Sequence, residues 1–425
     1  MSANRLAIDG GTPVRTRPFG PNHDFGQDDI DAVARVLSTG NIGRTCVPEF
    51  EEAFAKKVGV KHAVTVTSGT SAMHTCVAAI NPDPGDEIIV TAWTSAGSIL
   101  GLLWQNCVPV FADVDETYNM DPRDVEAKIT PRTRAILAVH LFGNPCDMGA
   151  LKDIAERYNL FLIEDACQAH FAEWQGETVG SIGDIGGVSF GGKHLSAGGG
   201  GCVLTDDYNL WERSLLFSDC ALPRGHNTYA SLPYANYFLA PNYRLNELVA
   251  AVLVSQLKKI DGYIERKIWA AEKLNEAFAR IPEITPQVVR PGNKHSYWNY
   301  GITIDDEALG IAAPRFAEML VAEGIPFSGP YIGTPDVGPL YRNPFLAGPH
   351  LYGHSRFPLD YGREKAIDYR HIECPYGEAL FSRNCIMQMR PSFTEDDIND
   401  IVTAVEKVVE HCRRGAAASV GAHSA

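Results

Sequence analysis

Short runs of apolar residues alternate with segments of helical pattern through the first 260 residues. The apolar runs have the length and composition of buried strands, and they lie at 87–90, 108–112, 135–139, 161–164 and 187–190. Between them lie segments with apolar residues every three or four positions, as in 147–157. Strands that alternate with helices predict a mostly parallel sheet covered by helices on both faces. The expected fold class is therefore α/β.

A long amphipathic segment at 247–279 predicts a helical bridge to a second domain. The chain has 425 residues, which is more than one hydrophobic core normally serves. We therefore expect a large domain over 1–260 that includes an N-terminal arm, and a smaller C-terminal α+β domain over 261–413. Residues 414–425 are small and polar, and we expect them to be disordered.

A run rich in proline and glycine occupies 325–353 in the second domain. It contains Ser328, Tyr331, Tyr341 and His350, whose side chains can bind a small polar molecule. The run has two interpretations of equal weight. It is either a loop that covers a substrate or a connection on the surface.

Composition and charge narrow the class of protein. The chain has 37 basic and 52 acidic side chains and a net charge of −15, which argues against nucleic acid or an anionic membrane as its main partner. Its ten cysteines show no Cys-x-x-Cys spacing, so neither a zinc site nor a disulfide framework is expected. The chain has no signal-peptide pattern at 1–11 and no apolar stretch long enough to span a bilayer. We expect a cytoplasmic protein with free thiols.

Lys193 is the first candidate for chemistry. It follows Ser189 by four positions and lies just before the four glycines at 198–201. A lysine has an ordinary pKa of about 10.4, yet only its neutral amine attacks an aldehyde, so a reactive lysine needs burial or nearby positive charge. Most lysines in glycine-rich loops are solvated surface residues. The alternative, a lysine that binds the aldehyde of pyridoxal phosphate, depends on the residues that accompany it.

Glu164 and Asp165 end a second segment of interest. Four apolar residues at 160–163 precede them, which indicates a buried strand whose carboxyl end opens at the edge of the sheet. Side chains alternate along a strand, so only one of the two acids can face a ligand there. Asp165 is the better candidate to keep a pyridine nitrogen protonated. The other interpretation is that the acids cap the following helix.

The turn Ser68-Gly69-Thr70 lies between a short apolar strand and a helical segment. Backbone amides and hydroxyl groups converge at such a helix N-terminus, which is suited to bind a phosphate. Serine and threonine are also ordinary helix caps, so this turn alone is weak evidence.

Together these segments resemble the DegT/DnrJ/StrS aminotransferases, which are fold-type I pyridoxal phosphate enzymes that act on keto sugars and cyclitols. The resemblance extends over nearly the whole chain, and the segments that carry it are 6–11, 38–44, 67–72, 111–115, 130–135, 139–143, 163–170, 242–247 and 374–375. Several of these motifs are common individually, but their order and spacing are specific. The chain looks most similar to the branch that includes scyllo-inosose aminotransferases and 3-amino-5-hydroxybenzoate synthases.

The resemblance implies a role for each matching residue. Lys193 would form the Schiff base and move protons, Asp165 would contact the pyridine nitrogen, and Gln168 would lie near the ring and its phenolic oxygen. The residues implied at the phosphate are Ser68, Gly69, Thr70, Ser189 and, from the neighbouring subunit, Asn242. The resemblance thus implies a homodimer in which two chains build each site.

The same resemblance implies the reaction. An amino group from L-glutamine or L-glutamate would pass to a keto sugar or keto cyclitol, in the synthesis of amino sugars or aminoglycoside-type antibiotics. Pyridoxamine phosphate would be the form of the cofactor between the two half-reactions. Because one product leaves before the second substrate reacts, the resemblance predicts ping-pong kinetics.

The loop around Lys193 departs from the family pattern by one residue. Counting forward from Ser189 places His194 at the Schiff-base position, whereas counting back from Leu195 and the glycines places Lys193 there. Relatives with histidine at that position act as sugar dehydratases with pyridoxamine phosphate. A dehydratase that uses His194 is therefore the alternative function, and we favour Lys193.

Two further departures concern the surroundings of the cofactor. The glutamate usual in the glycine run is Gly199 here, and the aromatic residue that stacks on the cofactor ring aligns with Ser95. Trp93 lies two residues earlier and would face the same way on a strand. Trp93 either supplies the stacking or belongs to the hydrophobic core.

Overall fold

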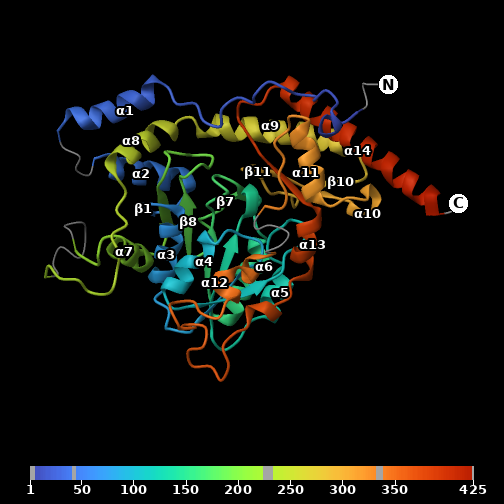
Figure 1. Cartoon of the computed structure of the whole chain (residues 1–425). Helices are drawn as coiled ribbons and strands as arrows, with labels where there is room; N and C mark the ends of the chain where they lie inside the picture. Colours follow the sequence, from blue (N-terminus) through green and yellow to red (C-terminus); the bar gives the residue numbers. More distant parts are fainter. Residues whose placement is uncertain (1–4, 41–44, 224–232, 332–337, 424–425) are drawn as a thin grey trace.

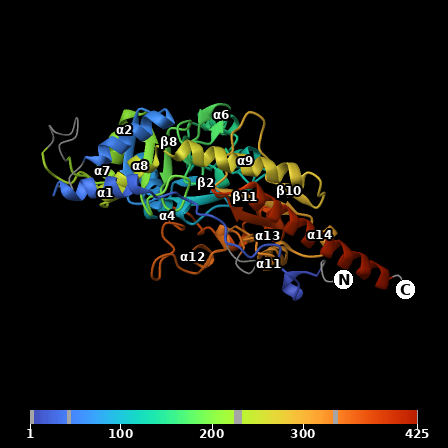
Figure 2. The same ribbon diagram turned by 90° about the horizontal axis from the view of Figure 1, so that it is seen from above.

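The computed structural model describes residues 5–40, 45–223, 233–331 and 338–423, with side chains up to residue 415. Residues 41–44 of the family segment 38–44 lie outside this part of the chain. Figure 1 shows helix α9 (Ile260–Phe278) along the upper edge of the molecule, leading from the central sheet to a smaller part that contains α14 (Glu395–His423). Seen from above, both termini lie at the α14 end of the molecule (Figure 2).

A seven-stranded sheet forms the centre of the larger part, in the order β1-β9-β8-β5-β4-β2-β3. Strand β9 pairs antiparallel with both of its neighbours, β1 and β8, and the other strand pairs of this sheet are parallel. The strands are β1 (His62–Val66), β2 (Glu87–Thr91), β3 (Val108–Ala112), β4 (Thr133–Val139), β5 (Phe161–Asp165), β8 (Ile185–Ser189) and β9 (Gly201–Thr205). The mostly parallel sheet and the five strands predicted from the apolar runs are confirmed.

Both faces of this sheet are buried because successive strand residues point to opposite sides. Ile88 and Val90 belong to one hydrophobic cluster, whereas Ile89 belongs to another. The helices that flank the sheet are α2 (Cys46–Val58), α3 (Gly69–Ala79), α4 (Gly97–Trp104), α5 (Pro122–Ala127), α6 (Met148–Tyr158), α7 (Tyr208–Phe217) and α8 (Glu247–Gln256). Asp147 and Asn246 begin α6 and α8 as side-chain caps, which accept backbone amide hydrogen bonds.

The smaller part has its own antiparallel sheet and hydrophobic cluster. Its strands are β10 (Ile284–Pro286), β11 (Asn299–Ile304) and β12 (Asn384–Gln388), and its helices are α10 (Asp306–Leu309), α11 (Ala313–Ala322), α13 (Pro375–Arg383) and α14. The cluster includes Phe278, Ile302, Phe316 and Val405. Ala270 and Leu274 of α9 belong to the same cluster, whereas Ile260 and Ile264 belong to a cluster of the large sheet, so the chain enters the smaller part within α9.

The packing departs from the sequence-based domain boundaries in three places. Leu6 of the N-terminal arm packs in the cluster of the smaller part. Tyr341, Leu359 and Tyr369 pack in a cluster of the large sheet, and the Tyr369 hydroxyl donates to the carbonyl oxygen of Pro109 at 2.7 Å. Helix α14 continues to His423, so the structure has a helix where composition predicted disorder from residue 414. Its alanine-rich end has a high helix propensity, which explains the difference.

Three further findings concern chemistry and location. All ten cysteines are free, and eight of them are buried. Within the described ranges, no cluster of three or more histidine, cysteine, aspartate or glutamate residues is arranged to hold a metal ion. Among the same residues, no helix combines the length and the apolar character needed to cross a bilayer.

Candidate active site

Asp165 lies at the carboxyl end of β5, at the edge of the parallel sheet. Its carboxylate accepts hydrogen bonds from the Ser98 hydroxyl at 2.7 Å and from the backbone amide of Cys167 at 3.0 Å. Ser98, on α4, is in turn 2.8 Å from the Thr94 hydroxyl. Asp165 is 4% exposed, so these contacts hold its carboxylate in one orientation within a buried site.

Glu164 points to the opposite side of the sheet, as the alternation along a strand requires. The backbone amides of Gly180, Ile182 and Gly183 donate to its carboxylate at 2.6–2.7 Å, and His140 Nε2 lies 3.0 Å from it. Burial raises the pKa of Glu164, but the His140 hydrogen bond and charge and the backbone donors outweigh burial, so the net pKa lies below its ordinary value. Glu164 therefore organises the loop after β5 and does not face the candidate site.

The turn Ser68-Gly69-Thr70 begins α3, and Ser68 caps this helix by accepting the amide of Ser71 at 3.0 Å. A Cβ atom at Gly69 would lie 2.5 Å from the Ser189 Cβ, so only glycine fits beside this serine. The Thr70 hydroxyl lies on the same side, 3.2 Å from the position that a Cβ of Gly97 would take. Hydroxyl groups and the first amides of a helix meet here, a combination that binds phosphate groups.

Lys193 extends toward this site from the loop between β8 and β9. Its Nζ lies 3.2 Å from the centroid of the Trp298 indole ring. Burial lowers the pKa of Lys193 to about 8, while the charges of Cys167 and Asp165 act to raise it. A lysine with this pKa has a substantial neutral fraction near neutral pH, as the sequence-based interpretation of Lys193 requires.

His194 lies in a different environment from its neighbour. Its Nε2 is 2.9 Å from the carbonyl oxygen of Ser296, and its Nδ1 is 3.4 Å from Nδ1 of His170. A carbonyl oxygen only accepts, so the hydrogen is on Nε2. Burial holds the pKa of His194 well below its ordinary value. Both ring nitrogens are thus occupied inside the protein, whereas the Lys193 amine lies on the Trp298 ring and is subject to the charges of Asp165 and Cys167.

Gln168 follows Asp165 on the next turn of the chain and is 5% exposed. Its Oε1 accepts the backbone amide of Phe142 at 3.0 Å, and its Nε2 donates to the Tyr331 hydroxyl at 2.6 Å. Tyr331 also packs edge-on against Phe142. The run 325–353 thus reaches the site through Tyr331, while Tyr341 contacts Glu378 and His350 is exposed.

Trp93 is buried in a hydrophobic cluster with Phe381, and their ring centroids are 4.7 Å apart at 64°. Among the described residues, its indole Nε1 has no hydrogen-bond partner. The structure therefore supports the interpretation of Trp93 as a core residue, and a role in stacking on a cofactor stays a prediction.

Asn242 is exposed, and its side chain accepts a long hydrogen bond from the amide of Arg244 at 3.4 Å.

Ser98 and Trp298 belong to the site but were not identified from the sequence. Ser98 lies on α4 and contacts Asp165 across 67 positions of the chain. Trp298 Nε1 donates to the carbonyl oxygen of Gly192 at 3.1 Å, across 106 positions. A single sequence contains no local sign of contacts over such distances. The one local sign of Ser98 is that it is a small hydroxyl residue a few positions after the end of β2, where a polar side chain can lie at the edge of the sheet.

The residues fit pyridoxal phosphate. Gly69, Thr70 and Ser189 are the residues that would hold the phosphate, in a space that a Cβ at Gly69 would fill, and Asp165 offers a buried carboxylate for the pyridine nitrogen. Lys193 offers an amine of lowered pKa for the aldehyde. Each end of the cofactor thus meets the chemical group that it needs.

Comparisons with known proteins agree with this chemistry. The model of the DegT/DnrJ/EryC1/StrS aminotransferase family matches residues 23–356. A putative L-glutamine:3-amino-2,3-dideoxy-scyllo-inosose aminotransferase of Micromonospora echinospora is 33% identical over 95% of this chain and 97% of its own. The L-glutamine:2-deoxy-scyllo-inosose aminotransferase of Streptoalloteichus tenebrarius is 34% identical over 96% and 98% of the two chains. The crystal structure of 3-amino-5-hydroxybenzoic acid synthase superposes with a TM-score of 0.81 at 27% identity, and the match covers 94% of this chain and all of that one.

Proposed function

This chain belongs to the DegT/DnrJ/EryC1/StrS aminotransferase family, and we propose that it moves the amino group of L-glutamine to a keto cyclitol. It is a pyridoxal-phosphate-dependent transaminase. Two relatives that match almost its whole length are named as L-glutamine-dependent aminotransferases of deoxygenated scyllo-inososes, one of them as a putative one. The observation that carries the proposal is that the Lys193 amine has a pKa lowered by burial and is subject to the charge of Asp165, while the Gly69 turn lies against Cys167 and Ser189 at the ends of β5 and β8.

Each residue of the site has a defined task in such a reaction. Bound pyridoxal phosphate supplies an electron sink. Lys193 Nζ takes a proton from the carbon that loses the amino group and returns one to the carbon that gains it. Asp165 would hold a proton on the pyridine nitrogen, and Ser98 fixes the Asp165 carboxylate through its hydrogen bond. The first turn of α3 binds the phosphate.

A half-reaction tests the donor. The purified protein, loaded with pyridoxal phosphate, is mixed with L-glutamine, L-glutamate or L-alanine in the absence of an acceptor. We expect L-glutamine to remove the visible absorbance of the bound cofactor and to release one equivalent of keto acid. No loss of absorbance with any of the three amino acids would contradict transamination.

A second half-reaction tests the acceptor. The aminated protein is mixed with 2-deoxy-scyllo-inosose or with a nucleotide-linked keto sugar, and the return of the absorbance is timed. We expect the keto cyclitol to react at least about tenfold faster, because the two relatives named above act on rings of this kind. Faster return with the nucleotide sugar would redirect the proposal to amino sugars. Initial rates with both substrates should give parallel lines, because the amino group is held by the protein between the two steps.

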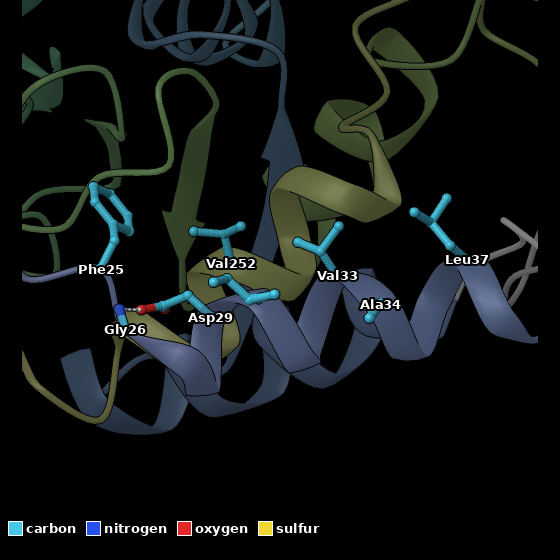
Figure 3. Close-up of a pocket in the computed structure, with 8 residues that line it drawn as sticks. Phe25, Gly26, Asp29, Val33, Ala34, Leu37 and Val252 are labelled. Carbon is cyan, nitrogen blue, oxygen red and sulfur yellow. Dashed lines mark hydrogen bonds between the residues drawn. The ribbon is translucent and has the colours of Figure 1, made fainter.

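We also propose that the protein is a cytoplasmic homodimer with shared sites. Phe25, Ile30 and Leu37 are 54%, 62% and 57% exposed, although all three are large and apolar. Figure 3 shows Phe25, Val33 and Leu37, on and just before α1 (Gln27–Ser38), lining an open pocket with Val252 of α8. A second copy of the chain is the proposed cover for this surface.

Complementation between subunits tests the shared site. Lys193→Ala and Asn242→Ala proteins are unfolded together and refolded as a mixture. If Asn242 serves the partner's phosphate, each mixed dimer contains one site with both residues intact, so the mixture should be more active than either variant alone. Activity equal to the average of the two pure proteins would contradict sharing through Asn242. Sedimentation of the native protein gives its mass independently.

A further inference from the structure

Three consecutive residues of the lysine loop contact one short segment of the smaller part. The Gly192 carbonyl oxygen accepts from Trp298 Nε1 at 3.1 Å, the Lys193 ammonium lies 3.2 Å from the centroid of the Trp298 ring, and His194 Nε2 donates to the Ser296 carbonyl oxygen at 2.9 Å. The segment 296–298 leads directly into β11. The loop that contains Lys193 is therefore docked on the second domain through both main-chain and side-chain contacts.

The indole of Trp298 is itself fixed. Its backbone amide donates to the Phe142 carbonyl oxygen at 2.7 Å, and its carbonyl oxygen accepts the amide of Met389 at 3.1 Å. The preceding residue, Tyr297, has a φ of 51°, which is rare for a bulky side chain, and its ring stacks on His295 at 3.7 Å. A strained residue persists only where surrounding contacts hold it. Trp298 thus presents its ring from a rigid support.

We propose that Trp298 is a positioning residue for Lys193. Its indole face holds the lysine ammonium whenever the amine is protonated, and its Nε1 donor ties down the loop at Gly192, so the amine stays directed at the edge of β5. This inference rests on the proposed function, in which Lys193 is the reacting amine. During each half-reaction Lys193 would carry a proton in the interval between taking it from one carbon and returning it to another, and a loose four-carbon side chain would have to find its target again at every step.

The chemistry of the ring suits this task. An aromatic face attracts a cation through its quadrupole, tryptophan most strongly, and the effect is larger where water is excluded. An indole face accepts no proton and cannot form an ion pair. It therefore holds the ammonium and still allows the group to lose its proton and become the reactive neutral amine. A carboxylate in the same place would keep the amine protonated far above neutral pH.

Other charged groups around Lys193 must be considered in any test based on pH. Cys167 and Asp165 act on it from the end of β5, and His170 follows them in the same loop. The imidazole of His23, in the N-terminal arm, lies 2.6 Å from the Lys193 carbonyl oxygen. None of these groups is changed by a substitution at Trp298.

The pH dependence of cofactor capture tests the proposal. Cofactor-free protein is mixed with pyridoxal phosphate, and the rate of appearance of its bound absorbance is measured from pH 6 to 10. Since only the neutral amine reacts, the wild-type midpoint should lie near the lysine pKa of about 8. Trp298→Leu removes the attraction for the ammonium, so its midpoint should fall by about 0.5 to 1 pH unit. Trp298→Phe retains a weaker aromatic face and should give a smaller fall.

Trp269 provides the matched control. It lies on α9 with the Arg266 guanidinium 4.6 Å from its ring, so it also holds a cation, and it packs against the hydrophobic cluster of the smaller part. Trp269→Leu should leave the midpoint unchanged. A Trp298→Leu midpoint equal to that of wild type, in a protein with unchanged circular dichroism, would overturn the proposal.

A second measurement covers the case in which Trp298→Leu does not fold. Fluorinated tryptophans weaken the cation attraction of the ring with little change in volume, so their incorporation should lower the midpoint in steps. The same incorporation into Trp298→Phe should have no effect. If fluorinated tryptophans still lowered the midpoint in Trp298→Phe, the effect would come from another tryptophan and the proposal would be overturned. Lys193→Ala separates the two hypotheses, because covalent cofactor capture by that variant would refute the proposed function itself.

Discussion

The two ends of the candidate site are held together in different ways. The phosphate end is built from adjacent parts of one domain, since Ser68, Gly69 and Thr70 begin α3 and Ser189 ends the nearby strand β8. The amine end depends on segments far apart in the chain. The Lys193 loop is held by His23 of the arm and by Ser296 and Trp298, which lie just before β11.

This difference separates binding from chemistry. A helix N-terminus provides phosphate affinity as soon as the helix forms, because its amides and hydroxyl groups come from one turn. A reactive amine needs a specific pKa and position, and both require burial by other parts of the molecule. We therefore expect changes at the phosphate end to alter cofactor affinity, and changes at the amine end to alter rates and their pH dependence.

Loss of the amine should have the largest effect. Lys193→Ala should reduce the turnover rate by at least about 10³-fold while noncovalent cofactor binding remains, because the phosphate end is untouched. Steady-state kinetics and equilibrium dialysis measure the two quantities. Lys152→Ala, at an exposed position of α6, is the control. If instead His194→Asn abolished turnover and Lys193→Ala did not, the dehydratase alternative would return.

The paired acids of β5 give the next largest contrast. Asp165→Asn should lower the turnover rate by about 10²-fold or more with little loss of stability, because it removes the carboxylate that would keep the pyridine nitrogen protonated. Glu164→Gln should lower the free energy of unfolding by about 3 kcal/mol with little loss of turnover, because a buried acceptor of three amides and His140 is replaced. Urea unfolding and steady-state kinetics on both variants measure this. Equal losses of stability would contradict the opposite orientations.

The lowered pKa of Glu164 also predicts that the stability of the protein depends on pH. Its pKa is lower in the folded protein than the ordinary value of 4.5. Its contribution is therefore fully present above the ordinary pKa and is lost as the pH falls through the lowered pKa of the folded state. The difference in unfolding free energy between wild type and Glu164→Gln should narrow over that acid range and stay constant above it. A constant difference throughout would mean that the carboxylate is not the stabilising species.

A substitution at the phosphate end should weaken cofactor binding with a smaller effect on rate. Gly69→Ala places a Cβ 2.5 Å from the Ser189 Cβ, so we expect the dissociation constant for pyridoxal phosphate to rise by about 10- to 100-fold. Gly199→Ala is the matched control, because a Cβ there meets nothing within 4 Å. Adding Ser189→Gly to Gly69→Ala should recover part of the affinity by removing the clash. Failure of any rescue would place the cradle elsewhere.

The arm should give the smallest effect. His23→Ala removes one hydrogen bond to the Lys193 carbonyl oxygen, worth about 1 kcal/mol, so we expect a loss of turnover of up to about fivefold. Because the contact supports the amine end only, the cofactor dissociation constant should not change. A change in affinity equal to the change in turnover would mean that the arm supports both ends alike.

Much of the large domain was predictable because its patterns are local. The apolar runs identified strands of the central sheet, and the alternation of side chains distinguished Asp165 from Glu164 before any contact was known. The Ser68 turn could be identified for the same reason, since a helix cap involves residues three positions apart. The packing of Tyr341 and Tyr369 against the large sheet could not be predicted, because residues of the second half of the chain return there without any periodic pattern.

The sequence alone determined the family, the fold class and the chemical groups available to the site. Residue type sets what a side chain can do, and the spacing of apolar residues sets which strand or helix it occupies. The tertiary structure added the surroundings of Lys193 and His194, two neighbours that counting along the loop left open. It buried both rings of the His170 and His194 pair and placed the Lys193 amine against Trp298, near Asp165. Burial sets the pKa of the Lys193 amine, and contacts across 100 or more positions of the chain set the direction of its side chain. Neither is a property of local sequence.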